Sequence, residues 1–173
     1  MLRMPRWGIV CCLTLEWVAL AVWVGGMIVL SGAVIPAVFN TFGGQDSGGM
    51  FLTRAFEGYH RFVIGASGLL AAVMVGRWWS GEARVMVSAS ELIVFVIMVV
   101  TAGVIILVLH PDAAALQMQA FATKDEGAKK AALEAFFRVV LPIRSLYMVN
   151  LVMGLLLIGI RVKRMLDDDG RQS

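Results

Sequence analysis

The chain has 173 residues, of which 60% are hydrophobic and only 16% are charged, and its mean hydropathy is +0.83. A water-soluble domain of this length could not enclose so many apolar side chains in one core, so a soluble globular protein is excluded. The net charge of +3 comes from basic residues at the ends of apolar runs. They are not interleaved with aromatic residues, so nucleic acid is excluded as a partner. The sequence therefore predicts an integral membrane protein, with the lipid bilayer as its surroundings.

Four apolar runs are each long enough to cross a hydrocarbon layer of roughly 30 Å, which takes about 20 helical residues. They predict an all-α, four-helix membrane bundle with spans at residues 7–36, 62–79, 85–109 and 139–160. The first run resembles a signal peptide at its start but continues past the small-residue site at 19–21, so we expect it to stay uncleaved. Because this run exceeds one span, we expect it to tilt or to leave the membrane near Pro36.

The connections between spans follow a simple pattern. The two outer loops predict amphipathic interfacial helices at residues 50–60 and 112–137, the second broken at 124–127. The second span is short, so we expect Arg77 to extend toward the headgroups. Four spans place both termini on one side, and a slight excess of basic residues there predicts that this side is cytoplasmic. No internal repeat is visible.

Small residues recur at helical spacing in the first two spans. Such residues let helix backbones approach closely in lipid, either inside a bundle or against a partner chain. We predict helix packing by Ala21, Gly25, Gly26, Gly32, Gly65, Gly68 and Ala72.

Three ionisable residues, Glu16, Glu91 and Arg144, lie within the predicted spans, beside the polar residue Asn150. Each charge costs about 2.5 to 3.5 kcal/mol at the centre of a membrane helix. With a rise of about 1.5 Å per residue, Glu16 and Glu91 lie at similar depths from one membrane face. Arg144 lies near the other face, where we expect its partner to be His110, Asp112 or Glu57.

The two glutamates have no obvious cation at their depth, which leaves three interpretations. They are protonated and hydrogen-bonded to neighbouring groups, because desolvation disfavours the charged form. Alternatively, they share a proton or a cation as part of a conduction site. In the third interpretation they face a partner subunit.

His60 and His110 are the two histidines of the chain, and both fall at the outer ends of spans. Two imidazoles at matched depth on neighbouring helices could bind haem b or a copper ion. The alternative is that His60 faces lipid headgroups and His110 begins a helix. The methionines are scattered singly, which is typical of core packing.

Three segments together resemble a known family: "WVGGMIVLSGAVIPAVFNTF", "GGMFLTRAFEGYHRF" and "FFRVVLPIRSLYMVNLVMGLLL". They are similar to the transmembrane protein 205-like family, small four-helix membrane proteins with a domain of unknown function. Where that family tends to carry a histidine before the serine of its last helix, this chain has Leu141 and Pro142. The Trp23–Gly26 segment also resembles the copper resistance protein D group, which is linked to copper uptake.

The sequence contains no nucleophile and base pair, phosphate loop or zinc-ligand spacing. We therefore predict a non-enzymatic multi-pass membrane protein, a structural or accessory component packed against other membrane subunits or against itself. The alternative is a protein that handles haem, copper, ions or protons through His60 and His110, or through Glu16 and Glu91.

Overall fold

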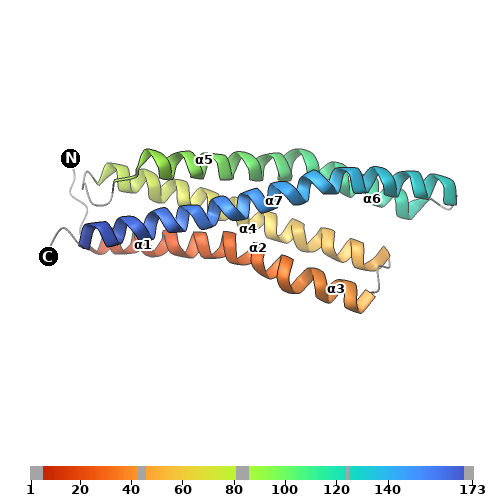
Figure 1. Cartoon of the computed structure of the whole chain (residues 1–173), viewed down its shortest axis with the longest axis horizontal. Coiled ribbons are helices and arrows are strands. Elements are labelled where there is room, and N and C mark those ends of the chain that lie inside the picture. Colours follow the sequence, from red (N-terminus) through yellow and green to blue (C-terminus); the bar gives the residue numbers. More distant parts are fainter. Residues whose placement is uncertain (1–5, 43–45, 81–85, 124, 170–173) are drawn as a thin grey trace.

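The computed structural model describes residues 6–42, 46–80, 86–123 and 125–169, and it consists of helices that run side by side (Figure 1). Three segments, η1 to η3, have π-helical hydrogen bonding. The elements are α1 (Arg6–Leu20), η1 (Ala21–Gly25), α2 (Gly26–Val29), η2 (Leu30–Val34), α3 (Ile35–Phe42), α4 (Asp46–Trp79), α5 (Ala89–Val104), η3 (Ile105–Leu109), α6 (His110–Ala122) and α7 (Glu126–Asp169).

These elements form two helical hairpins. In the first, the continuous rod from α1 to α3 packs along α4, and in the second, the rod from α5 to α6 packs along α7. The start of α1 and the end of α7 lie at one end of the bundle, which we call the termini end (Figure 1). At the opposite end, the hairpin end, α3 turns toward α4 and α6 toward α7.

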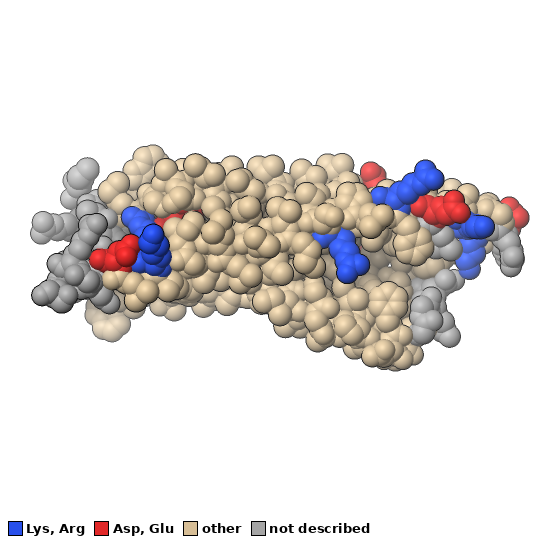
Figure 2. All heavy atoms as spheres, viewed as in Figure 1, with Lys and Arg blue, Asp and Glu red and all other residues tan. Residues whose placement is uncertain are grey.

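The predicted all-α four-helix membrane bundle is confirmed. Four continuous helices are long and apolar enough to cross a membrane, at Trp7–Phe42, Ser47–Trp79, Ala89–Ala122 and Gly127–Asp167. On the face shown in Figure 2, charged side chains gather toward the two ends of the bundle, and one basic side chain lies between the middle and the hairpin end, with an uncharged band beside it. An exterior of this kind suits a multi-pass protein whose middle is surrounded by lipid tails.

The first helix continues through Pro36, near which we expected the long first run to leave the membrane unless it tilts. The rod continues as α3, and the π-helical η2 lies directly before this proline. The same arrangement recurs at Pro111, which follows η3. Proline lacks an N–H group, and its ring crowds the carbonyl four residues earlier. A widened π-helical turn before the proline relieves this crowding, so the helix continues past the proline.

The amphipathic segments of the outer loops are not separate interfacial helices. Residues 50–60 lie inside α4, which runs into the second span without a break. Residues 112–137 are divided between α6 and the start of α7. The Asp125 carboxylate accepts a hydrogen bond from the Ala128 N–H, 3.1 Å away, which fixes the start of α7. Two expected positions, Val85 at the start of the third span and Lys124 in the break, lie outside the described residues.

Candidate functional site

A cluster of buried charges joins the helices near the termini end. We call it the arginine–glutamate cluster; its members are Glu16, Arg77, Glu91, Arg161 and Arg164. Arg77 donates to Glu16 at 3.0 Å and to Glu91 at 2.8 Å. Arg161 donates to Glu16 and lies 3.7 Å from Glu91. Each of these two arginines therefore contacts both carboxylates, one from each hairpin.

Burial makes these contacts strong. The side chains of Arg77, Glu16 and Glu91 are 1%, 2% and 0% exposed. Arg164 is 35% exposed and donates to Glu91 at 2.7 Å. Charges removed from water are tolerated only when they are paired and hydrogen-bonded, and this cluster meets both conditions.

Local sequence holds Glu91 in place. Ser88 caps α5, because its hydroxyl accepts a hydrogen bond from the Glu91 N–H at 3.2 Å. The Glu91 carboxylate thus lies in the first turn of α5, where the helix dipole favours a negative charge. Arg164 also donates to the Met86 carbonyl at 2.8 Å, which ties the segment before α5 to α7.

The expectation of neutral glutamates without a cation is wrong, and so is that of Arg77 extended toward the headgroups. The glutamates were expected only at a common depth, and the structure brings them into one site in which three arginines pair with them. The same depth arithmetic would have placed Arg77 and Arg161 in this layer. Depth alone does not say toward which side of a helix a residue points, so it does not distinguish an Arg77 that extends toward the headgroups from one that points into the bundle.

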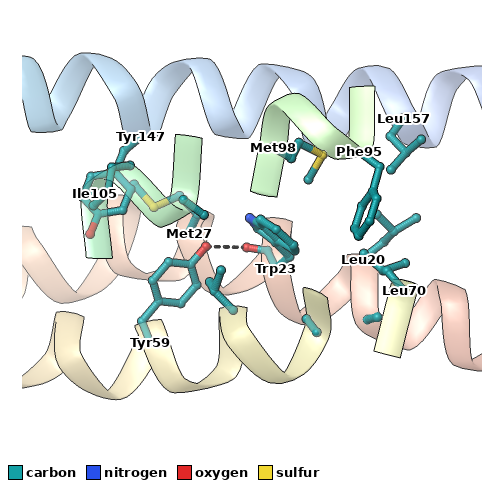
Figure 3. Close-up of a cluster of buried hydrophobic side chains, with 14 of the residues drawn as sticks. Leu20, Trp23, Met27, Tyr59, Leu70, Phe95, Met98, Ile105, Tyr147 and Leu157 are labelled. Carbon is teal, nitrogen blue, oxygen red and sulfur yellow. Dashed lines mark hydrogen bonds between the residues drawn. The ribbon is translucent and has the colours of Figure 1, made fainter. Parts of the chain in front are cut away.

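A second group of polar side chains lies nearer the middle of the bundle. Trp23 donates its indole N–H to the Asn150 side-chain oxygen at 2.8 Å, and the Asn150 amide donates to the Met98 carbonyl at 2.9 Å. The Tyr59 hydroxyl donates to the Trp23 carbonyl at 2.7 Å (Figure 3). Asn150, predicted only as an intramembrane polar residue, thus connects α7 to η1 and α5. Sequence reasoning missed Trp23 and Tyr59 as its neighbours.

The two histidines meet at this level of the bundle. Their ring centroids are 4.6 Å apart in an edge-to-face arrangement. The His60 Nε2 lies 2.6 Å from the Tyr147 hydroxyl, a hydrogen bond in which either group can donate. His60, Tyr59, Tyr147, Trp23 and Asn150 line a cavity of about 20 Å³, which has room for roughly one water molecule.

We call the five side chains Trp23, Tyr59, His60, Tyr147 and Asn150 the polar layer. An apolar layer separates it from the arginine–glutamate cluster, and its members are Leu20, Leu70, Phe95 and Leu157. Figure 3 shows these four on one side of Trp23 and the two tyrosines on the other. No hydrogen-bonded path of described side chains crosses this apolar layer.

The predicted small packing residues fall into two sets. A Cβ atom on Gly26 would lie 2.8 Å from the Tyr59 ring, so this glycine permits close packing. Gly25, Gly32, Gly65 and Gly68 have open space in the same position, and Ala21 and Ala72 are exposed. Sequence reasoning gave less weight to Gly154, where a Cβ atom would lie 2.6 Å from a Val24 methyl group.

The prediction for Arg144 is wrong. Arg144 is exposed on α7 and forms no ion pair with His110, Asp112 or Glu57. Among the described residues, no group of three or more His, Cys, Asp and Glu side chains could hold a metal ion. A metal ion held beside the polar layer would therefore depend on the two imidazoles, His60 and His110.

Comparison with known families reaches part of each group of polar residues. A family model described as a domain of unknown function, DUF4149, matches residues 18–122. The matched segment includes Trp23, Tyr59, His60, Arg77 and Glu91. Comparisons with curated proteins and with solved structures give no match. Because the family model spans more than half of the chain, this multi-pass membrane protein belongs to the DUF4149 family.

Proposed function

We propose that this protein is a non-enzymatic accessory or structural component of a larger membrane assembly. The observation that carries the proposal is a set of small residues that the bundle leaves unused. Gly25 and Gly68 have open space where a side chain would begin, and Ala21 and Ala72 are exposed. Small residues on a lipid-facing helix allow another helix to approach closely.

The charges of the bundle support the same proposal. The carboxylates of Glu16 and Glu91 are occupied by arginines from the chain itself. Removal of one partner from a buried ion pair is strongly destabilising, so groups that are already paired in this way are poor carriers for an ion. We also propose that the termini end faces the cytoplasm, since Lys163, Arg161 and Arg164 lie there. The resemblance to the transmembrane protein 205-like family agrees with this membrane role.

Substitution of one small residue tests the proposal. Gly68→Leu should release partner subunits from the protein purified out of its native membrane in mild detergent, because leucine would hold the partner helix away. Gly159→Leu is the matched control on α7, where the added side chain also meets open space. Native gels and mass spectrometry of the purified sample report the partners. Retention of the same partners by Gly68→Leu and the unsubstituted protein would contradict the role of this face.

The paired histidines favour a second candidate function, the handling of a proton or a single metal ion. His60 and His110 lie in ring contact, and His60 is hydrogen-bonded to Tyr147. The edge-to-face contact leaves no gap for a porphyrin between the two imidazoles, so haem ligated by both does not fit this arrangement. A copper ion suits imidazole ligands, as the resemblance to the copper resistance protein D group implies.

Metal analysis of the protein from its native membrane tests this candidate. Stoichiometric copper that is lost in both His60→Ala and His110→Ala would support it. Tyr147→Phe is the control variant, since it removes the hydrogen bond to His60 and keeps both imidazoles. A metal-free sample, together with unchanged proton flux in vesicles for His60→Ala, would exclude it.

A further inference from the structure

We propose that the two helical hairpins are copies of one unit, related by a pseudo-two-fold axis along the bundle, and that the polar layer is a site where the two copies have diverged. The first unit comprises α1 to α4 and the second α5 to α7. This inference goes beyond the proposed function. Its evidence lies in buried positions, helix irregularities and ion pairs.

The first helices of the two units bury the same pattern of positions. Residue 91 follows residue 16 by 75 positions (91 less 16), and this offset also relates most of the other buried positions. The first unit buries Glu16, Ala19, Leu20, Trp23, Met27 and Leu30, and the second buries Glu91, Val94, Phe95, Met98, Ala102 and Ile105. Val24 departs from the pattern, because it is buried whereas its match Val99 is exposed. These six matching positions fall within about four helical turns. They are more than the helical period alone requires, since that period does not fix which residues at the edge of a buried face are buried.

The second helices of the two units also match, with an offset of 84 positions (161 less 77). Six matched pairs are buried: α4 buries Tyr59, Val63, Ala66, Leu70, Val73 and Arg77, and α7 buries Ile143, Tyr147, Asn150, Gly154, Leu157 and Arg161. His60 and Met74 of α4 are buried as well, whereas their matches Arg144 and Ile158 are exposed and half-buried. The larger offset means that nine more residues lie between the matched parts of the second unit (84 less 75). These residues fall at the hairpin end, where α6 and the start of α7 extend further.

Two irregular features obey the same relation. The offset of 75 carries η2 onto η3 and Pro36 onto Pro111. The π-helix is rare, so the repetition of one π-helical segment at matching positions is specific evidence. The remaining π-helical segment, η1, has no counterpart, since the offset leads from it to residues 96–100 inside α5. In both units the helix accommodates its proline by a π-helical segment that lies one residue before it.

The arginine–glutamate cluster has the symmetry expected of two copies. Glu16 matches Glu91, and Arg77 matches Arg161. Each arginine contacts the glutamate of its own unit and the glutamate of the other unit. The pseudo-two-fold axis thus passes between these four side chains, and Arg164 is an addition of the second unit.

The polar layer breaks this equivalence. Trp23 and Asn150 form a hydrogen bond across the axis, whereas the matching positions hold Met98 and Ala66. Tyr147 likewise matches the buried Val63. The fold therefore accepts apolar side chains at these positions, which means that polar ones are not required for packing. In membrane proteins built from repeats, binding sites lie at the interface between the repeats, and the cavity beside Trp23 and Asn150 has this location.

Exchange of matched residues across the axis tests the duplication. The variant Trp23→Met/Ala66→Asn/Met98→Trp/Asn150→Ala keeps the composition of the layer and moves the hydrogen-bonded pair to the other side. Two half-exchanges, Trp23→Met/Met98→Trp and Ala66→Asn/Asn150→Ala, keep the composition but separate the tryptophan from the asparagine. If the matched positions are equivalent, the full exchange keeps the tryptophan–asparagine hydrogen bond that both half-exchanges lose. Its thermal unfolding midpoint in lipid nanodiscs should then be at least about 4 °C higher than that of either half-exchange. A full exchange no more stable than the half-exchanges would overturn the proposal.

A smaller exchange provides a second measurement if the four-residue variant does not fold. Leu20 and Phe95 are matched, buried members of the apolar layer. Leu20→Phe/Phe95→Leu should unfold close to the unsubstituted protein and above both single variants, because each position offers a similar environment. A double variant whose loss equals the sum of the two single losses would count against equivalence.

Discussion

At the scale of single residues, the bundle depends most on Arg77, which lies between two carboxylates from different hairpins. Its side chain is almost completely buried, and it contacts both Glu16 and Glu91. Removal of one member of such a group leaves the others charged and without full compensation. The effect should therefore exceed that of any exposed charge on the surface.

Arg77→Gln should lower the free energy of unfolding by about 3 to 5 kcal/mol, because two buried carboxylates lose a shared cation. Arg164→Gln should cost about 1 kcal/mol or less, since Arg164 is partly exposed and Glu91 retains other arginines. Lys163→Gln, at an exposed neighbouring position, is the control. Reversible unfolding in mixed detergent micelles measures all three. Equal losses for Arg77→Gln and Lys163→Gln would show that the cluster does not stabilise the bundle.

The close approach at Gly154 yields a second prediction for a single residue. In Gly154→Ala the new methyl group would lie 2.6 Å from a Val24 methyl group, so α7 and η1 must separate. Overpacking of this kind costs about 1 to 3 kcal/mol. Gly159→Ala, where the methyl group meets open space, should be neutral or slightly stabilising, because alanine favours helix. A thermal unfolding comparison decides between these outcomes.

At the scale of helices, the Ser88 side chain caps the start of α5. Ser88 accepts a hydrogen bond from the Glu91 N–H and so positions the carboxylate that contacts three arginines. Ser88→Ala should cost about 1 kcal/mol, as other helix caps do. The Ser90 hydroxyl contacts the Ser88 hydroxyl, and Ser90→Ala should have a smaller effect. Faster amide exchange in the first turn of α5 for Ser88→Ala alone would support this assignment, and unchanged exchange would oppose it.

Helical geometry decides which features of the fold and of the candidate site could be predicted from the sequence. Length and hydropathy gave the four helices, and the rise per residue placed Glu16 and Glu91 in one layer. Neither gives the direction in which a side chain points around its helix. That direction decides whether Arg77 meets lipid or glutamate, and whether Gly25 packs inside or lies on the surface. The meeting of His60 with Tyr147 depends on contacts between helices of different hairpins, which sequence spacing does not specify.

At the scale of the whole molecule, the protein consists of layers. The arginine–glutamate cluster fixes the termini end, an apolar layer follows, and the polar layer lies beyond it toward the hairpin end. The apolar layer interrupts any static route for a proton or ion through the bundle. The unused small residues Gly68 and Ala72 lie on the outside of the bundle. These features together favour a component that binds other membrane subunits over a channel.

The most direct test is the mass of the intact assembly, taken from the native membrane into nanodiscs without prior purification of the single chain. The account predicts particles that contain this 18.8 kDa chain together with other membrane subunits or further copies. It further predicts that Gly68→Leu shifts the chain toward the free form and that Gly159→Leu does not. A single 18.8 kDa chain in lipid, unchanged by either substitution, would contradict the central claim.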